Sequence, residues 1–375
     1  MHQISLQVYK ESKQYLWLFE IIMKNQGLNK DEFLLSHGIS PTSFRRARSS
    51  EQRVGIEIIE KLSKIFDYRV YKEEEIDQIE LLLNQIYNEV YFKIYDNFDS
   101  FFEKIENELN RKSILFPILN LFKMFLILNE HKQRKDTLRE NQELFNDLQK
   151  YGAFYNQDLK EIYEIVELIF MKDIPDEYMR NEYKNGLIYY SLASKYNFNK
   201  DYIASLYFAD RARKIFLQED NFLRIFFLNL IYMHNYNSLG NYKICCELAG
   251  NQLLSLKSLE IKSFIQSTTE LHLVIAHLGL RNYKKVIELL SNKEVYQSTE
   301  VYSLLIAKFM IDKKEYQELY NSTIKDNQNR KEDLYIIQTL NSFLLKRDKN
   351  NLMKLEKSNM REMLVKILKK NFFEE

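Results

Sequence analysis

Apolar residues recur at helical spacing from the start of the chain. Leu16, Phe19 and Met23 lie three and four positions apart, which predicts a helix from near Lys10 to Gln26. Gly27 follows this run, and glycine readily adopts the left-handed backbone that ends many helices. The pattern therefore predicts an amphipathic first helix that stops at this glycine.

Capping residues divide the next segment into further short helices. Asn29 stands before a polar first turn and predicts an N-cap, and the helix that it opens closes at His37-Gly38. Ser40 and Pro41 predict the start of a third helix, because serine caps well and proline lacks only an N–H that would go unused there. A fourth helix is predicted from about Val54 to Phe66.

The third predicted helix is rich in arginine, and Arg53 lies just beyond it. Phe44 and Ala47 are expected to face inward, which leaves outward Thr42, Ser43, Arg45, Arg46 and Arg48. A helix, a short turn and a second helix with Ser, Thr and Arg near its start have the geometry that enters a DNA major groove. Arginine pairs with guanine edges, and hydroxyl groups reach phosphates. We therefore predict that these five residues contact double-stranded DNA, with a four-helix cap and a solvated arginine face as the alternative.

The rest of the chain contains a repeated pattern in which a turn and a tyrosine precede a helix. The tyrosines are Tyr202, Tyr242, Tyr283 and Tyr316, at spacings of 40, 41 and 33 residues. A period of this length with two helices per unit is typical of a helical solenoid. The small residues expected to pack behind these tyrosines are Ala204, Cys245 and Val286. A non-repetitive helical bundle is the alternative.

The first helix of each pair lines the concave face of a stacked solenoid. The residues placed there by counting back from the tyrosines are Tyr190, Asn197, Leu230, His234, Asn237, Thr269 and Leu273. Amide and imidazole groups suit the backbone of an extended peptide, and leucines suit its apolar side chains. We therefore predict a peptide-binding face, while an ordinary solvated role stays open for each residue.

Composition supports an all-helical chain with more than one folding unit. The 375 residues include only 8 glycines and 3 prolines, and 45% are hydrophobic. Residues 1–70 contain 11 Lys/Arg and 8 Asp/Glu, a net charge of +3, whereas the whole chain has +1. A basic head on a near-neutral body suits a DNA-binding module. We predict a helix-turn-helix domain at 1–68 and a helical-repeat domain at 69–375 that binds peptide and mediates dimerisation.

Reactive chemistry is sparse along the chain. There is no glycine-rich phosphate loop, and His272 and His277 are five positions apart, a poor spacing for two metal ligands on one helix face. We expect no catalytic site, metal or cofactor, with an unrecognised catalytic site as an alternative. The adjacent Cys245 and Cys246 predict a reducing, cytoplasmic location. The most apolar stretch, Ile114–Leu128, is too short and interrupted to span a bilayer, so no membrane partner is expected.

Two segments resemble known families. Residues 26–33, 38–44 and 59–66 resemble the phage-repressor (Xre-like) helix-turn-helix, although the family's Glu-Arg-Gly run is replaced by Ala47-Arg48-Ser49-Ser50. The tyrosine pattern resembles tetratricopeptide repeats. The combination resembles the peptide-responsive transcription regulators of the Rgg/PlcR/PrgX type. This resemblance implies quorum sensing by a homodimer that binds a palindromic operator and a short signalling peptide. The alternative is a repeat scaffold that sequesters a protein partner without binding DNA.

Overall fold

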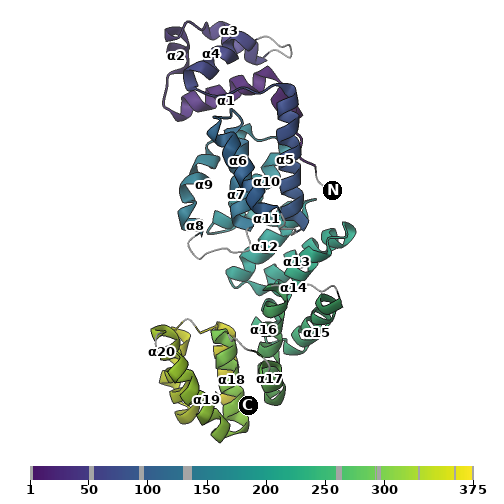
Figure 1. Ribbon diagram of the computed structural model, residues 1–375, viewed down its shortest axis with the longest axis vertical. Coiled ribbons are helices and arrows are strands. Elements are labelled where there is room, and N and C mark those ends of the chain that lie inside the picture. The colour runs from purple at the N-terminus through teal and green to yellow at the C-terminus, as the bar shows by residue number, and fades with distance from the viewer. Residues whose placement is uncertain are drawn as a thin grey trace. The chain divides into compact units, whose positions relative to one another are not determined.

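The computed structural model describes residues 3–49, 55–92, 97–129, 137–258, 264–291, 293, 297–327, 330–358 and 360–373. Over these ranges the chain folds into helices, and its only β-type feature is a single bridge between Arg69 and Ser113 (Figure 1). The all-α prediction is confirmed. Two compact units can be distinguished, a first unit of residues 1–195 and 211–224 and a second unit of residues 196–210 and 225–375.

The first unit begins with the four helices that were predicted. They are α1 (Ser12–Asn25), α2 (Lys30–Ser36), α3 (Pro41–Ser49) and α4 (Ile56–Phe66). Both predicted caps form: Asn29 Oδ1 accepts from the backbone N–H of Glu32 at 3.5 Å, and Ser40 Oγ accepts from that of Ser43 at 3.3 Å. The helix limits agree with the sequence pattern within two residues, because capping and periodicity are local properties of the chain.

Residues of α1 and α3 that the spacing of apolar residues placed in the core are buried in the structure. Leu16, Phe19 and Met23 are fully buried, and Phe44 and Ala47 of α3 pack inward as predicted. The stop glycines at positions 27 and 38 both have φ of +68°, a conformation that glycine adopts at little cost. Arg53, which the sequence places just beyond the third predicted helix, lies outside the described residues.

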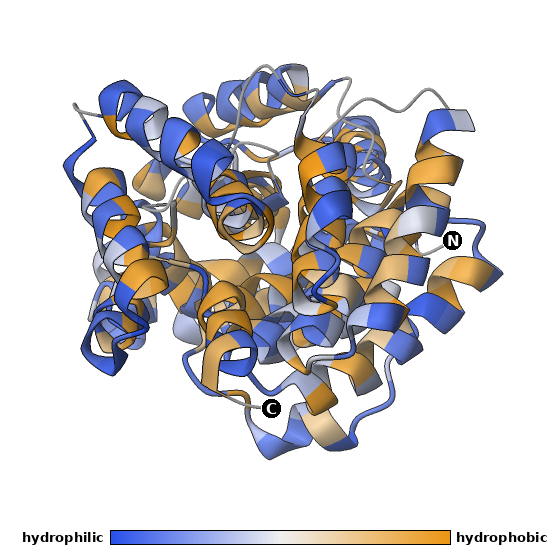
Figure 2. Cartoon of the chain, turned by 90° about the horizontal axis from the view of Figure 1, so that it is seen from below, coloured by the Kyte–Doolittle hydropathy of each residue, from blue (hydrophilic) through white to orange (hydrophobic). Residues whose placement is uncertain are grey.

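An apolar helix forms the centre of the rest of the first unit. The elements there are η1 (Gln7–Lys10), α5 (Glu73–Phe92), α6 (Phe98–Asn110), α7 (Phe116–Asn129), α8 (Thr137–Glu140), α9 (Gln142–Gln149), η2 (Gly152–Phe154), α10 (Gln157–Phe170) and α11 (Asp176–Arg180). Helix α7 is apolar on nearly every side and packs against α5, α6, α9 and α10. Figure 2 shows that many other helices are hydrophobic along one side and hydrophilic along the other. No helix among the described residues is both long and apolar enough to cross a bilayer.

The N-terminal residues pack on these later helices. The Tyr9 hydroxyl donates to the Phe154 carbonyl at 2.7 Å and accepts from the Asn156 N–H at 2.8 Å. The Ile4 N–H donates to the Asn84 side chain at 2.9 Å. Residues 1–68 and the helices up to residue 195 are therefore part of one compact unit, and the predicted boundary after residue 68 lies inside it.

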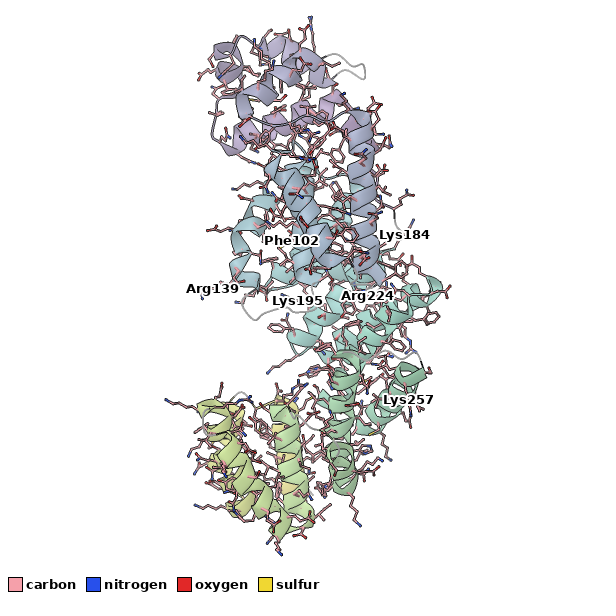
Figure 3. All side chains as sticks on the ribbon, in the orientation of Figure 1. Phe102, Arg139, Lys184, Lys195, Arg224 and Lys257 are labelled. Carbon is pink, nitrogen blue, oxygen red and sulfur yellow. The ribbon has the colours of Figure 1, made fainter. Side chains whose placement is uncertain are left out.

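A buried arginine hydrogen-bonds to the backbone carbonyls at the C-terminal end of α5. The Arg224 side chain, labelled in Figure 3, has no solvent exposure and donates its Nε–H to the Tyr91 carbonyl at 3.0 Å. Arg224 also donates to the Val90 carbonyl, and Asn221 Nδ2 donates to the Tyr91 carbonyl at 2.8 Å. The last carbonyls of a helix lack intrahelical partners and carry partial negative charge, so a cation stabilises this end.

The remaining helices follow one another along the chain as pairs joined by short turns. They are α12 (Gly186–Phe198) with α13 (Tyr202–Gln218), α14 (Phe222–Ser238) with α15 (Tyr242–Ser258), α16 (Phe264–Gly279) with α17 (Tyr283–Leu290), α18 (Ser298–Ile311) with α19 (Lys313–Asp326), and α20 (Lys331–Lys346) with α21 (Lys349–Glu356), followed by α22 (Glu362–Phe373). Three of the four repeated tyrosines are the first residues of helices α13, α15 and α17, and Tyr316 lies in the first turn of α19. The succession of helices and the positions of the tyrosines confirm that this part of the chain is repeat-like.

The small-residue position of the first repeat differs from the prediction by one residue. Ala204 is half-buried, whereas Ser205 is fully buried, three positions after Tyr202. Cys245 and Val286 are also fully buried, each three positions after its own tyrosine. The register of a helix face is set by positions three and four apart, so Ser205 and not Ala204 is the equivalent residue.

Candidate nucleic-acid interface and candidate ligand site

Helix α3 presents its polar residues to solvent. Phe44 and Ala47 are buried, and α3 packs against α1 and α2. The exposed side chains of α3 include all five predicted DNA contacts, namely Thr42, Ser43, Arg45, Arg46 and Arg48. The chain thus places two hydroxyl groups and three guanidinium groups on the exposed side of one nine-residue helix that carries no carboxylate.

Two of these arginines form ion pairs within the first unit. Arg45 pairs with Asp31 of α2, and Arg48 pairs with Glu20 of α1. Glu20 also pairs with Lys30 at 2.7 Å. Exposed pairs of this kind contribute only about 0–1 kcal/mol each, so a phosphate can replace the carboxylate at little cost.

Arg46 is the arginine of α3 that no carboxylate of the described residues holds. Among the described residues its guanidinium has no ion pair or hydrogen bond, and its carbonyl accepts from Ser49 Oγ at 3.1 Å. Lys61 of α4 adds a cation beside the α2–α3 turn, where its Nζ donates to the Gly38 carbonyl at 3.1 Å. The partial positive charge at the N-terminus of α3 also favours an anion such as a phosphate.

The predicted peptide-binding residues do not all lie in one unit. Tyr190 belongs to the first unit, where the Arg224 guanidinium lies 5.3 Å from the centroid of its half-buried ring. The other residues of the predicted set lie in the second unit, namely Asn197, Leu230, His234, Asn237, Thr269 and Leu273. The second unit therefore carries the larger part of the candidate ligand site.

A hydrogen-bonded group, here called the polar seam, links α12, α14 and α16. It consists of Asn197, His234, Asn235, Asn237 and His272. Asn197 Nδ2 lies 2.9 Å from His234 Nδ1 and donates to Asn235 Oδ1 at 2.7 Å. Asn237 Nδ2 donates to the His272 carbonyl at 3.1 Å and lies 3.4 Å from His272 Nδ1. The two imidazole rings are perpendicular with centroids 6.0 Å apart.

Three predicted contact residues are buried and do not form an open surface. Asn237 and Leu273 are 2% and 8% exposed, and Thr269 has no exposure. The Thr269 hydroxyl donates to the Ile265 carbonyl at 2.7 Å and accepts from Gln252 Nε2 at 2.8 Å. Counting back from the tyrosines located these residues along their helices but did not show which helix face the neighbouring helices cover.

The C-terminal helix lies beside the polar seam, a contact that the sequence did not indicate. Helix α22 packs against α16, and its residue Glu362 pairs with Lys200 at 2.6 Å. Lys366 Nζ lies 5.6 Å from the centroid of the Tyr202 ring. Three charged residues of α22 and its N-terminal flank, Arg361, Glu362 and Lys366, thereby act electrostatically on His234.

Burial and these charges keep both histidines of the seam neutral. Burial lowers the pKa of His234 to about 4, and the positive charges of Arg361 and Lys366 act in the same direction. Burial lowers the pKa of His272 to about 3, with His234 and Arg361 as further causes. Burial also lowers the pKa of Arg361. At neutral pH the seam therefore presents imidazole groups that each carry one proton.

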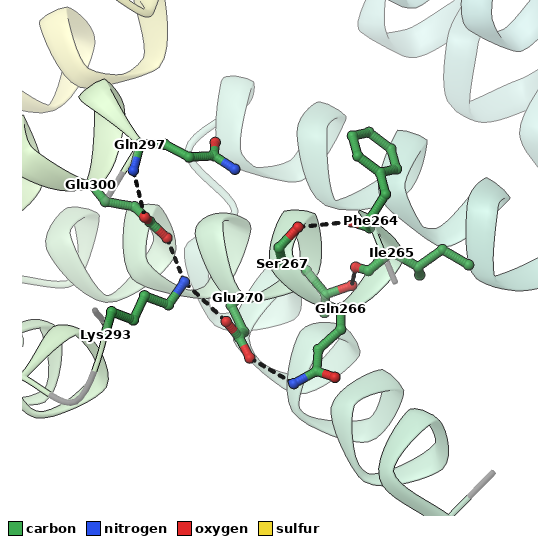
Figure 4. Close-up of polar contacts among 9 residues, drawn as sticks. Phe264, Ile265, Gln266, Ser267, Glu270, Lys293, Gln297 and Glu300 are labelled. Carbon is green, nitrogen blue, oxygen red and sulfur yellow. Dashed lines mark hydrogen bonds and ion pairs between the residues drawn. The ribbon is translucent and has the colours of Figure 1, made fainter. Parts of the chain in front are cut away.

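A second polar cluster joins α16 to α18. Lys293 pairs with Glu300 at 2.6 Å and with Glu270 at 3.0 Å, and Glu300 Oε2 accepts from the Gln297 N–H at 3.0 Å (Figure 4). Gln266 Nε2 donates to Glu270 at 3.0 Å. Every charged group here has a partner of opposite sign, so this cluster fixes two helices and leaves no group for chemistry.

Comparison with known proteins does not assign a function to helix α3 or to the polar seam. Among the residues that the structure describes, no group of three His, Cys, Asp or Glu side chains is arranged to hold a metal ion. Helix α3 and the polar seam are therefore the two sites on which a function can be argued. No protein-family model matches the chain, and no curated protein or solved structure matches it.

Proposed function

We propose that the chain is a DNA-binding transcriptional regulator whose helical-repeat body binds a short signalling peptide. One observation carries the DNA-binding part. Helix α3 buries one side and exposes on the other two hydroxyl groups and three guanidinium groups, near a turn that Lys61 of α4 contacts with a further positive charge. This is the chemistry and the placement of a helix that enters a major groove.

We assign a role in DNA binding to each exposed arginine and hydroxyl group of α3. Arg46, which is not paired with a carboxylate in the part of the chain that the structure describes, reads a base edge, because a guanidinium pairs bidentately with guanine. Arg45 and Arg48 exchange Asp31 and Glu20 for phosphates when DNA binds. The hydroxyl groups at the start of α3 contact the backbone of the same strand.

The decisive experiment compares Arg46→Ala with Arg139→Ala, an exposed arginine on the separate helix α8. DNA fragments that the wild-type protein selects from its own genome are used as duplex probes in fluorescence anisotropy at several salt concentrations. Loss of a base-reading arginine is expected to weaken binding by about 1–3 kcal/mol, and Arg139→Ala is expected to bind like wild type. If a folded Arg46→Ala protein binds with wild-type affinity and salt dependence, α3 is not the reading helix.

The peptide-binding part rests on the polar seam. Extended peptides need partners for their amides, and the seam provides histidine and asparagine side chains on successive helices of the repeats. His234→Ala is expected to abolish the effect of culture supernatant on DNA binding and to leave peptide-free DNA binding intact. Asn237 is unsuitable for this test because it is buried and supports α16. An unchanged response in the His234 variant would place the peptide elsewhere.

A repeat scaffold that sequesters a protein partner is the second candidate. The ion pairs of Arg45 with Asp31 and of Arg48 with Glu20 favour it, because they give two of the three arginines of α3 a structural partner. Retention on immobilised duplex DNA separates the two functions. A regulator is retained at moderate salt with a steep salt dependence, whereas a scaffold passes through.

A further inference from the structure

Helices α5 and α6 lie side by side in the first unit and form the two sides of a groove (Figure 1). A cavity of about 400 Å³ lies at the C-terminal end of α5, and a second cavity of about 400 Å³ lies towards the start of that helix. Gln85 and Lys104 line both cavities, so the groove is continuous. The lining residues of α5 include five that share one helix face, namely Glu75, Gln78, Leu82, Gln85 and Glu89.

Two acceptor atoms at the Glu89 end of the groove have no donor. Asn88 Oδ1 and Glu89 Oε2 are buried, and neither has a hydrogen-bond partner among the residues that the structure describes. The other carboxylate oxygen, Glu89 Oε1, accepts from Asn97 Nδ2 at 2.8 Å. All three side chains line the cavity at this end. A buried carboxylate oxygen without a donor is costly, so this end favours a ligand that brings N–H donors and positive charge.

The charged groups of the groove are paired at one end and not at the other. Near the start of α5 the guanidinium groups are held by carboxylates, in the pairs Arg69–Glu75 and Arg111–Glu108. At the other end Lys104 Nζ lies 5.4 Å from the centroid of the Phe101 ring, and no carboxylate of the described residues pairs with it. Lys104 therefore does not neutralise Glu89, whose charge is available to a cationic ligand.

The middle of the groove suits a polypeptide backbone. The side chains there are carboxamides and leucines, namely Gln78, Leu81, Leu82, Gln85 and Asn107. A carboxamide donates and accepts, as a backbone amide requires, and leucines suit apolar side chains. From Glu75 to Glu89 the groove follows about 21 Å of helix, the length of about six residues of extended chain. A polyamine fits less well, because the cations of the groove repel it and its methylene groups leave the carboxamides unpaired.

We propose that the α5–α6 groove binds the N-terminal part of an extended peptide and holds its terminal ammonium at Asn88 and Glu89. Both side chains are half-buried, and rotation about their outer bonds turns the two oxygens towards the cavity, where the ammonium donates to them. Gln85 and Gln78 then pair with the peptide backbone. This inference goes beyond the proposed function, because the groove lies in the first unit and the residues of the polar seam lie in the second.

The test measures ligand binding to the full-length protein by saturation-transfer difference NMR. The probes are leucyl-leucinamide, its N-acetyl derivative, which lacks the ammonium, and putrescine, a diamine without amide groups. Leucyl-leucinamide is expected to bind at least about tenfold more tightly than the acetylated probe, as for a charge-assisted hydrogen bond, and more tightly than putrescine. Glu89→Gln is expected to remove this difference, because it keeps the acceptor for Asn97 and loses the charge. Glu103→Gln, at an exposed position of α6 outside the groove, is expected to preserve it.

A second variant keeps the proposal open to contradiction if Glu89→Gln does not fold. Asn88→Asp adds a carboxylate at the site and is expected to tighten the binding of leucyl-leucinamide by about threefold or more, with no gain for the acetylated probe. An unchanged preference in either folded variant places the ammonium elsewhere.

The wild-type protein gives further decisive outcomes. Equal binding of the free and acetylated dipeptides, or no binding of either, means that the groove has no ammonium site. Tighter binding of putrescine than of leucyl-leucinamide assigns the groove to simple amines and rejects the peptide. These outcomes leave the proposed function to its own test, because DNA binding is measured separately.

Discussion

At the residue scale, Gly279 determines how closely α16 approaches α15. A Cβ atom at this position would lie 2.5 Å from the Tyr242 ring, so the tyrosine that begins α15 packs directly on the glycine backbone. Gly250, in the middle of α15, has no heavy atom within 4 Å of the same virtual atom. The two glycines therefore form a matched pair in neighbouring helices.

We predict opposite effects for alanine at these two positions. Gly279→Ala should lower the free energy of unfolding by about 1–3 kcal/mol, because the ring must move out of a packed interface. Gly250→Ala should raise it by about 0.4–1 kcal/mol, because alanine restricts the unfolded chain and favours the helix. Urea unfolding followed by circular dichroism measures both. Equal effects of the two substitutions would contradict this account of the α15–α16 contact.

The two histidines of the polar seam make stability depend on pH. Their pKa values in the folded protein are about 4 for His234 and about 3 for His272, below the unfolded value of about 6.5. The unfolded chain therefore binds protons that the folded protein excludes. The stabilisation is complete well above pH 6.5. It is lost as pH falls towards 4 for His234 and towards 3 for His272, by at most about 1.4 kcal/mol per pH unit for each histidine.

Replacement of both histidines by asparagine tests this prediction. Urea unfolding at pH 7, 6 and 5 should show a smaller decrease in the variant than in wild type, whatever the absolute stability of the variant. An identical decrease in both proteins would assign the pH dependence to other groups.

At the element scale, the attachment of α22 depends on its apolar side. Leu364 is fully buried, whereas the Glu362–Lys200 ion pair has side chains that are 44% and 65% exposed. We predict that Leu364→Ala destabilises the second unit by about 2–5 kcal/mol. Glu362→Gln should change stability by no more than about 1 kcal/mol, because water screens the exposed pair.

Hydrogen exchange of the α22 backbone amides distinguishes these contributions. Faster exchange of α22 in the Leu364 variant, with little change in the Glu362 variant, is the expected result. If Glu362→Gln released the helix instead, charge and not burial would hold α22 in place.

At the scale of the whole molecule, we predict a homodimer, because two-fold symmetric operators are read by paired heads. Phe198 and Ile203, at the α12–α13 junction of the second unit, are 81% and 68% exposed, and we place the dimer interface there because neighbouring exposed apolar side chains, unlike single ones, mark association surfaces. The variant Phe198→Ser/Ile203→Ser should be monomeric, and Leu254→Ser, at a 70% exposed position on α15, should leave the dimer intact.

Light scattering of the full-length proteins at micromolar concentration provides the measurement. The full chain is required because the N-terminal residues pack on later helices of the first unit, for example through Tyr9 and Phe154. A monomeric wild-type protein would contradict the homodimer, and a dimeric double variant would place the interface elsewhere.

The sequence by itself determined the four N-terminal helices with their limits and the starts of three of the repeat helices. The caps at Asn29 and Ser40, the stop glycines and the tyrosines that begin α13, α15 and α17 were all predicted correctly. The exposed side of α3 was predicted as well. These features depend on hydrogen bonds within one turn and on the helical period, which residues a few positions apart control.

Only the tertiary structure decided which groups meet. Thr269 and Asn237 are buried because α16 packs into neighbouring helices, and Arg45 and Arg48 are held by carboxylates of other helices. Helix α22 packs on α16 although residues 280–361 separate the two helices in the chain. Such contacts depend on how whole helix faces pack, and many arrangements of amphipathic helices share one hydrophobic pattern, so local periodicity does not select among them.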